Sequence, residues 1–429
     1  MTGVRLRTLT PLWTGDVDRH CSGVKETGLV GSLRWWTEAV LRGMNEFACD
    51  PTEEYSRCPK SKENNLNIPF YCVSCLIFGA TGLRKTFKFS VNGGEKIFGG
   101  GSIKMLPKGR ARGWFLGSGL EGSLDLNLIP LGSEFNENLV LVPLAVASNW
   151  GGIGAKTQLG YGVVALEDSS EITIRNFEDS LKKLKELKFS KNLELRKENN
   201  NPLPNIKEMF FAKIQFKTDR DWWREVDGIK GVLEKDDRLA KWISSGSVPV
   251  APIIKNWLRY GDGQKFWKTR DQYKDKRIEN WLFGTTARVH RICFNKLNED
   301  KNKRDRYWCP NCKSSLIDKN TFERLSSKVN VSHAYPSQDN KWEFRIWGWI
   351  PKDSLQKEFN RESFLDRLKG SLDGSGSVKT WKDLFGNLTL GHQLKVWREF
   401  DSSRDSVKPN EEMIESYLQS LLNYGEEGQ

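Results

Sequence analysis

The sequence predicts an α+β protein with two tandem ferredoxin-like (RRM-like) domains, each in the order β-α-β-β-α-β with insertions. Two observations predict this fold. Strand-like and helix-like segments follow the same order before and after a charged stretch at residues 181–205. A short echo also links the halves, because CLIFGATGLRKTF (75–87) and NWLFGTTARVHRICF (280–294) both place an aromatic residue, Gly, one further residue and Thr ahead of basic residues.

In the first half, alternation of apolar and polar residues predicts strands, and apolar residues at helical spacing predict helices. The segments are a strand at 4–7, a helix at 33–47, strands at 84–91 and 123–131, a helix at 139–150 and a strand at 161–166. Periodicity alone leaves residues 139–150 open between a helix and a buried strand. We favour a helix because this segment leads into a glycine-rich loop that feeds the last strand.

The second half repeats the order. Its segments are a strand at 209–218, a helix at 251–260, strands at 288–294 and 340–350, a helix at 360–372 and a strand at 392–400. A last helix at 411–422 is expected to pack on the outside.

Residues 181–205 mix lysines with glutamates and end in NNNPLP, which must break any helix. This composition predicts an N-terminal domain at 1–180, a charged linker at 181–205 and a C-terminal domain at 206–429.

The charge balance favours a polyanionic partner. The chain has 67 Lys and Arg against 55 Asp and Glu, a net charge of +12. It has no apolar stretch long enough for a membrane span and no apolar signal region at its start, so we expect a cytoplasmic protein with no membrane partner. In that compartment the eight cysteines are thiols or metal ligands rather than disulfides.

The glycine-rich segment WGGIGAKTQLGYG (150–162) holds five glycines and one lysine, Lys156. A backbone with so few side chains can approach a phosphodiester closely and present N–H groups, while the lysine adds a charge. The alternative is a tight connection between a buried helix and a strand. The Walker pattern GxxxxGK[ST] is absent, so nothing in this segment supports nucleotide hydrolysis.

Four motifs together resemble the RAMP superfamily of CRISPR proteins. They are TPLWTG (10–15), ETGLVGSLRWWTEAVLRG (26–43), CVSCLIFGATG (72–82) and GGIGAKTQLGYG (151–162). Within the superfamily they are most similar to the first-named RAMP subunit of the Cmr (type III-B) effector complex. The resemblance is dense in the first half and reaches the second half only through FGTTAR (283–288) and the order of strands.

This resemblance implies paired ferredoxin-like domains and membership of a ribonucleoprotein in which guide RNA pairs with target RNA. It implies a place near the 3′ end of the guide, contact with single-stranded guide or target RNA, and other Cmr subunits as partners. It implies no catalytic role and no cofactor for chemistry. We expect the isolated chain to be a monomer.

RNA binding that tolerates many sequences needs cations, backbone donors and flat surfaces for bases. We predict contacts from the glycine-rich loop, the first helix, a basic loop at 104–115 and two basic strand entries. The residues are Gly151, Gly152, Gly154, Lys156, Gln158, Arg34, Arg42, Arg84, Lys85, Lys108, Arg110, Arg112, Arg288 and Arg291. If the halves are duplicates, both strand entries should face one groove.

Ordinary structural roles compete with two of these assignments. Arg34 could instead pair with Glu38 on a solvated helix face. The basic loop has four cations and no carboxylate, and we expect it to be mobile with Trp114 available to stack on a base; the alternative is a solvated hairpin tip.

The spacing His290-x2-Cys293-x15-Cys309-x2-Cys312 is typical of a zinc knuckle and predicts a structural zinc site. A flat strand would point His290 and Cys293 to opposite faces, so His333 is an alternative ligand. Four thiolate or imidazole ligands would leave no open position for chemistry.

The first half offers a second metal candidate in Cys49, Cys58, Cys72 and Cys75, which include one CxxC pair. Because the other spacings are long, we favour buried free thiols there.

Two other functions stay open. Some RAMP relatives process the guide precursor as metal-independent endoribonucleases, generally with a histidine as acid or base, and His20 beside Asp16 and Asp18 is the best-placed candidate. The other is a scaffold that contacts proteins only.

Overall fold

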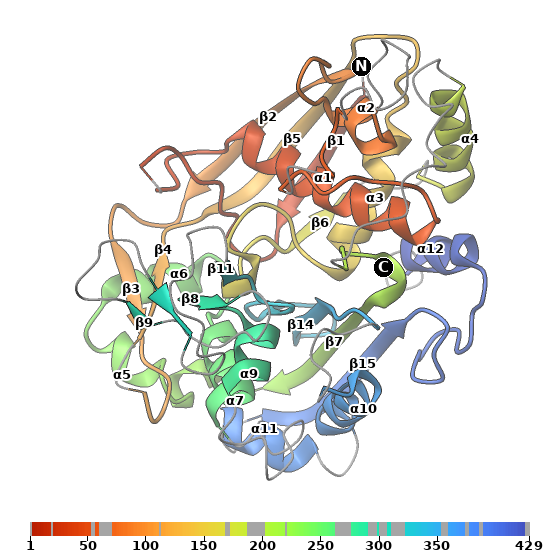
Figure 1. The fold of residues 1–429 in the computed structure, drawn as a ribbon. Coiled ribbons are helices and arrows are strands. Elements are labelled where there is room, and N and C mark those ends of the chain that lie inside the picture. Colours follow the sequence, from red (N-terminus) through yellow and green to blue (C-terminus); the bar gives the residue numbers. More distant parts are fainter. Residues whose placement is uncertain are drawn as a thin grey trace.

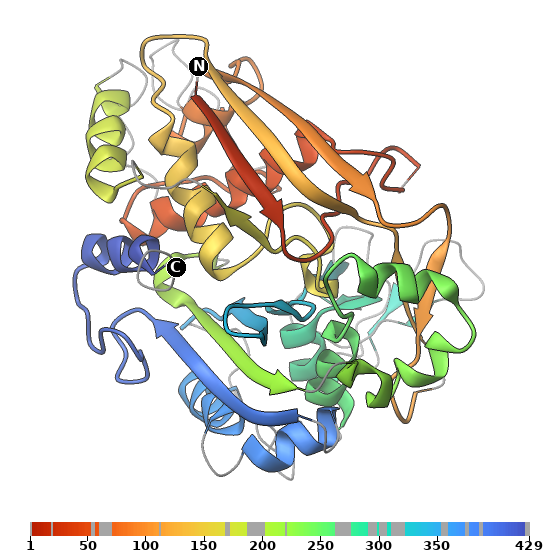
Figure 2. The same cartoon turned by 180° about the vertical axis from the view of Figure 1, so that it is seen from behind.

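The computed structural model (Figures 1 and 2) has two halves, each built on an antiparallel sheet. It describes residues 2–424 except 19, 53–55, 60–70, 111–112, 168–171, 187–201, 219–220, 262–275, 291–297, 300–306, 310–321, 353–358, 374–376 and 386–388. The mixed α+β class predicted from the sequence is confirmed.

The N-terminal sheet has the spatial order β2-β5-β1-β6. Its strands are β1 (Thr2–Thr8), β2 (Phe87–Lys96), β5 (Leu120–Pro130) and β6 (Val164–Leu166). Leu6 of β1 pairs with Leu124 of β5 on one side and with Leu166 of β6 on the other. Alternate residues of β5 are buried, as the period of a half-buried strand requires.

One face of this sheet is covered by α1 (Glu26–Gly43) and α3 (Asn138–Trp150), which pack on each other. The apolar stripe of α1 is buried through Leu29, Leu33, Trp36 and Val40, and Glu26 and Arg42 lie at the ends that the helix dipole favours. The helix predicted at 139–150 is confirmed, and almost all of α3 is buried. The shorter helices of this half are α2 (Val73–Phe78) and α4 (Ile174–Lys185).

The C-terminal sheet has the order β12-β14-β7-β15, and β13 adds to β14. Its strands are β7 (Met209–Thr218), β12 (Val329–Val331), β13 (Tyr335–Pro336), β14 (Lys341–Trp349) and β15 (Thr389–Glu399). Eight consecutive residues of β7 are buried, because one face packs inside its own half and the other meets the N-terminal half. Phe211, for example, stacks on Trp36 with ring centroids 6.4 Å apart.

The helices of the second half are α5 (Lys230–Leu233), α6 (Asp237–Ser244), α7 (Ala251–Tyr260), α9 (Lys276–Phe283), α10 (Arg361–Leu372), α11 (Ser377–Phe385) and α12 (Ile414–Asn423). Short 3-10 turns lie at η1 (Thr157–Leu159), η3 (Ile206–Glu208) and η4 (Trp222–Glu225). No helix in the described part of the chain is both long and apolar enough to span a membrane.

One predicted strand lies in the wrong place. The described part of the segment predicted at 288–294 belongs to β8 (Thr285–His290), which pairs with β11 (Phe322–Leu325) in a separate ribbon. The strand beside β14 in the main sheet is β12. Only three residues long, β12 is too short to show a periodic pattern in the sequence. Two further short strands, β9 (Asn298–Glu299) and β10 (Tyr307–Trp308), pair with each other.

Two elements cross between the halves. The C-terminal helix α12 packs on α3 and α4 of the first half, partners that the sequence does not indicate. Trp150 Nε1 donates to the Leu421 carbonyl at 2.9 Å, and Tyr417, Leu418 and Leu421 are fully buried. In the other direction, the hairpin of β3 (Ser102–Met105) and β4 (Trp114–Gly117) reaches down beside α5 and α6.

Candidate functional site

The glycine-rich segment at residues 151–162 connects α3 to β6 where the two halves meet (Figures 1 and 2). The second half holds it by main-chain and side-chain hydrogen bonds. His333 N donates to the Gly160 carbonyl at 3.2 Å, and Lys255 Nζ donates to the Gln158 carbonyl at 2.9 Å. The segment is therefore part of the contact between the halves, which its glycine content alone does not reveal.

Two of the predicted RNA-contacting glycines are inside the protein. Gly151 and Gly152 are buried, and Trp36 Nε1 donates to the Gly152 carbonyl at 3.0 Å. A Cβ on Gly151 would lie 2.4 Å from Cζ2 of Trp36. Gly151 makes room for Trp36, and a Cβ on Gly152 would lie 3.1 Å from the Gly162 carbonyl oxygen, so the prediction that these two glycines contact RNA is corrected.

The turn at residues 154–158 is the accessible part of the segment. Ala155 and Gln158 are exposed, and Gly154 and Lys156 have positive φ angles of 79° and 59°. Within the described chain no group accepts from the backbone N–H groups of Lys156, Thr157 and Gln158. Consecutive N–H groups without a protein acceptor are suited to an anion.

Lys156 stands over the ring of Trp13, with Nζ 3.1 Å from the ring centroid. Burial lowers the pKa of Lys156 to about 8, and nearby Cys21 opposes this shift. The lysine is thus fixed by a cation–π contact while it remains partly accessible. Gly154, Lys156 and Gln158 all lie in this accessible turn, and their contact with RNA stays a prediction.

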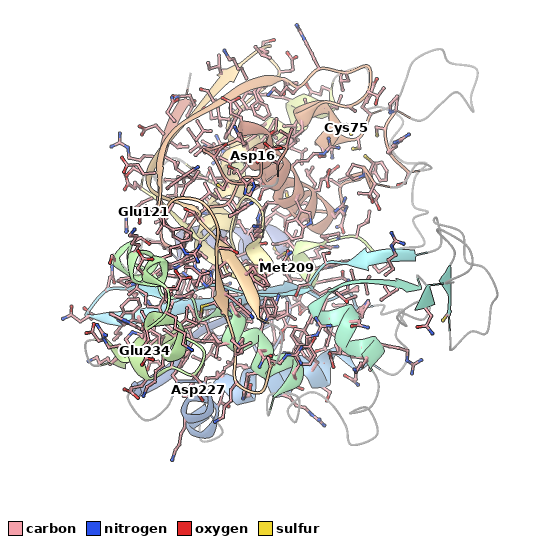
Figure 3. All side chains as sticks on the ribbon, turned by 90° about the vertical axis from the view of Figure 1, so that its left-hand side faces the viewer. Asp16, Cys75, Glu121, Met209, Asp227 and Glu234 are labelled. Atoms are coloured by element: carbon pink, nitrogen blue, oxygen red, sulfur yellow. The ribbon has the colours of Figure 1, made fainter. Side chains whose placement is uncertain are left out.

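The loop that carries His20 follows Trp13, and its neighbour Cys21 lies beside Lys156. His20 is exposed, and its backbone N–H donates to Asp16 Oδ1 at 2.8 Å. A hydrogen bond from Ser22 lowers the pKa of the Asp16 carboxyl, and burial opposes it. Asp16 is labelled in Figure 3, in the N-terminal half above Met209 of β7.

Arg34 and Arg42 bond within the protein. Arg34 pairs with Glu38 (Nε to Oε1, 2.8 Å) and also donates to the Gly79 carbonyl and to Cys75 Sγ. Arg42 donates to three main-chain carbonyls, those of residues 48, 49 and 204. Their side chains are only 20% and 12% exposed. Burial raises the pKa of Glu38 even between these two guanidinium groups.

The alternative assignment for Arg34, a pair with Glu38, is thus present in the structure, but on a buried helix face. Most N–H donors of the two guanidinium groups bond inside the protein. They are therefore less available to a phosphate than the ammonium group of Lys156.

The two basic strand entries do not share a groove. Arg84 and Lys85 precede β2, whose first residue, Phe87, pairs with Pro130 at one end of β5. The other end of β5, Leu120, bonds to Leu12 near the glycine-rich segment. Since β5 has 11 residues, its ends are about 30 Å apart at roughly 3.3 Å per residue. Arg288 lies on β8 in the other half, so the shared groove is not formed; Arg291 lies outside the described residues.

The predicted basic loop is the tip of the β3–β4 hairpin, and it lies against the second half. Arg110 stacks on Tyr260 at the end of α7, 3.9 Å from the ring centroid. Lys108 is 3.4 Å from Asp227, with both side chains largely exposed. These contacts place the described part of the loop against the second half; Arg112 lies outside the described residues.

The exposed aromatic ring of the hairpin is Phe115, which is 61% exposed, whereas Trp114 packs partly against the core. Phe115 pairs with the exposed Lys104 on β3. At the hairpin base, Tyr161 donates to the Gly117 carbonyl at 2.7 Å, and a Cβ on Gly117 would touch the Trp13 ring. The hairpin therefore begins beside the Lys156–Trp13 pair. The expectation that Trp114 is available to stack is thus corrected: tertiary packing covers part of Trp114 and leaves Phe115 exposed.

The predicted zinc knuckle falls largely outside the described residues. Cys293 and Cys312 lie outside them, and only the backbone of His290 is described. Cys309 is buried. The alternative ligand His333 is fully buried, and burial lowers its pKa to about 3.

Four cysteines of the first half form a compact cluster. The Sγ atoms of Cys49, Cys58, Cys72 and Cys75 all lie within 4.8 Å of one another, and all four residues are buried. None of the described cysteines forms a disulfide bond. The fold closes the long sequence spacings and brings these four buried, free thiols together. The arrangement can hold a metal ion.

Comparison with known proteins gives one family match, to the model of the RAMP superfamily over residues 5–165. No curated protein sequence matches the chain. Among solved structures, Cmr1 from Pyrococcus furiosus in its apo form shares 14% identity, with 85% of this chain and 92% of that chain covered and a TM-score of 0.33.

A chain of the type III-B Cmr-beta complex bound to cognate target RNA shares 14% identity, covering 85% of this chain and 97% of that chain, with a TM-score of 0.38. A chain of a second Cmr-beta structure, with target RNA, AMPPnP and ssDNA, shares 13% identity. The match covers 85% of this chain and 98% of that chain, with a TM-score of 0.38. At these scores the similarities carry no argument about function. The match to the RAMP model covers residues 5–165, the part of the chain that holds the four motifs.

Proposed function

We propose that this protein is a non-catalytic, RNA-binding subunit of a type III-B CRISPR (Cmr) ribonucleoprotein, which contacts guide or target RNA near the 3′ end of the guide. The RAMP family match and the motifs at 10–15, 26–43, 72–82 and 151–162 support it. Other Cmr subunits would be its protein partners, and a cytoplasmic location stays a prediction.

We also propose that both halves are ferredoxin-like units. In the first sheet the spatial order β2-β5-β1-β6 places the second, third, first and fourth strands along the chain side by side. The order β12-β14-β7-β15 of the second sheet is the same when β13, which adds to β14, is left aside. Helices α1 and α3 in the first half, and α7 and α10 in the second, occupy the two helix positions of the β-α-β-β-α-β order.

The observation that carries the proposal is the turn at residues 154–158. Among the described residues no group accepts from three consecutive N–H groups here, and these lie next to a half-buried lysine whose ammonium group is positioned by Trp13. A phosphodiester would accept from the N–H groups and pair with the ammonium group. Phe115 and Lys104, on the hairpin that begins beside Trp13, offer a flat surface and a further cation for the adjacent nucleotides.

The test is a titration of the purified chain with single-stranded RNA, followed by filter binding at several salt concentrations. We expect affinity to fall steeply with salt and to depend little on sequence. Lys156→Ala should weaken binding about tenfold, because one charge-assisted phosphate contact is lost. Lys183→Ala is the matched control, since it removes an exposed lysine from α4, away from the turn.

The same titration separates the two alternative functions. A processing ribonuclease would cut repeat RNA without metal and lose that activity in His20→Ala. A pure scaffold would show no RNA binding by the isolated chain. Equal affinity of the Lys156→Ala and wild-type proteins would remove the turn from the binding site.

A further inference from the structure

We propose that Cys49, Cys58, Cys72 and Cys75 bind one zinc ion, which ties the segment between α1 and α2 to the start of α2. Nothing in this proposal depends on RNA. A chain that held zinc but bound no RNA would refute the proposed function alone, and the reverse result would refute the zinc site alone.

The distances suit one tetrahedral ion. Zinc–sulfur bonds of about 2.3 Å place the four sulfur atoms of a tetrahedral site about 3.8 Å apart. Here the Cys49 and Cys75 sulfur atoms are 3.6 Å apart, and no pair exceeds 4.8 Å. An iron–sulfur cluster with several metal ions would hold its thiolates further apart.

Hydrogen-bond donors point at three of the sulfur atoms. The backbone N–H of Cys49 donates to Cys72 Sγ at 3.4 Å, and that of Cys72 donates to Cys58 Sγ at 3.3 Å. Arg34 Nη2 donates to Cys75 Sγ at 3.2 Å. A neutral thiol is a weak acceptor, whereas metal-bound thiolates are normally held by such outer contacts.

The surrounding charges suit a tetrathiolate site. Zinc with four thiolates carries a net charge of −2, which must be balanced when it is buried. Arg34 supplies a guanidinium directly at Cys75, and Arg42 holds the carbonyl of Cys49 at 3.1 Å. Glu38 bridges the two arginines and offsets only part of their charge.

The site would be structural, because four protein ligands leave no open coordination position. Two of its ligands, Cys49 and Cys58, lie between α1 and α2, and the other two, Cys72 and Cys75, lie at the start of α2. Arg34 then links the site to the turn after α2, since its Nη1 donates to the Gly79 carbonyl at 3.0 Å. The label of Cys75 in Figure 3 lies high in the N-terminal half, far from Asp227 and Glu234 near the hairpin.

The test is the metal content of the full-length protein, purified without added metal or chelator, by inductively coupled plasma mass spectrometry. We expect about one zinc per chain at this site, released when a mercurial modifies the thiols and followed with a chromogenic chelator. The double variant Cys49→Ser/Cys75→Ser should lose that zinc. Cys21→Ser, which changes another buried cysteine outside the cluster, should keep it. Cys309→Ser isolates any metal bound by the predicted knuckle.

Cobalt(II) keeps the test decisive even if the double variant does not fold. The wild-type chain loaded with cobalt should show the visible bands of a tetrahedral thiolate site. Four results would overturn the proposal: zinc-free protein whose cluster thiols alkylate freely, a disulfide within the cluster, a coloured iron centre, or zinc that is lost only in Cys309→Ser.

Discussion

At the scale of single residues, the candidate site depends on how burial changes familiar side chains. The Lys156 ammonium group is half buried over Trp13, and Lys255, which holds the same segment from below, is almost fully buried. Burial lowers the pKa of Lys255 to about 7 and that of Lys156 to about 8. Only Lys156 lies beside the open N–H groups of the turn, so its protonation should be visible in RNA binding.

We expect the RNA affinity of the wild-type chain to fall as pH rises through about 8. Burial depresses the pKa of Lys156 to about 8, so the ammonium form that a phosphodiester favours is present below that pH and lost above it. The measurement is fluorescence anisotropy at constant ionic strength between about pH 7 and pH 9.5, a range in which an ordinary lysine stays charged.

Lys156→Arg is the control for this pH dependence. Arginine remains charged throughout the range, so the variant should bind with a flatter pH profile. Identical profiles for the two proteins would mean that Lys156 does not contact the RNA.

At the scale of elements, the hairpin of β3 and β4 shows how packing decides what a sequence leaves open. Ile103, Met105 and Leu116 are fully buried, so the strands present Lys104 and Phe115 outward. The sequence of this loop shows that it is basic, with four cations and no carboxylate. It could not show that Arg110 stacks on Tyr260, because that contact joins residues 150 positions apart.

We expect Phe115→Ala to weaken RNA binding about tenfold, since stacking of one base on an aromatic ring is worth about 1–3 kcal/mol. Its ring is 61% exposed, so the thermal midpoint should barely change. Phe115→Tyr keeps the flat surface and should bind like the wild type. The filter-binding assay would contradict the assignment if Phe115→Ala lost no affinity.

The C-terminal end of α3 is a second element that bonds to the other half of the protein. Arg345 of β14 donates through Nη1 to the carbonyls of Ser148 at 2.5 Å and Gly151 at 3.3 Å, where a helix end leaves carbonyls unpaired. Burial raises the pKa of Glu343, but Lys213 and Arg345 outweigh it and hold that pKa below its usual value. The Glu343 carboxylate therefore stays charged at the contact between the halves.

At the scale of the whole molecule, much of the fold is legible in the sequence because strands and helices carry their own periods. The order of the first half, the helix at 138–150 and the last strand, β15, follow the expected segments. What the sequence hides is long-range. The short strand β12, the crossing of α12 and the closure of four distant cysteines all depend on partners far along the chain.

The same reason explains the mixed outcome for the candidate site. The glycine-rich segment is recognisable by composition, yet four of its five glycines are buried against neighbouring groups, and only Gly154, at the turn, is partly accessible. A charged residue such as Arg42 looks the same in a sequence whether it faces solvent or bonds to carbonyls of residues 48, 49 and 204.

The junction of the halves should be unusually sensitive at Gly160. This glycine has a φ of 102°, and an added Cβ would lie 2.6 Å from both Ala251 Cβ and the His333 ring. We expect Gly160→Ala to lower the free energy of unfolding by about 2–4 kcal/mol, as backbone strain and overpacking add. Gly122→Ala is the matched control, because its φ is 99° but nothing lies within 4 Å of the added Cβ.

Denaturant unfolding, followed by tryptophan fluorescence, separates the cost of a positive φ angle from the cost of the steric overlap at Gly160. Gly122→Ala should cost only about 1 kcal/mol, the strain of a positive φ, so the difference between the variants measures the contact of the turn with Ala251 and His333. If the halves depend on this contact, Gly160→Ala should also separate the single unfolding transition into two. Equal losses in both variants, with one transition in each, would show that the glycine-rich segment does not couple the two sheets.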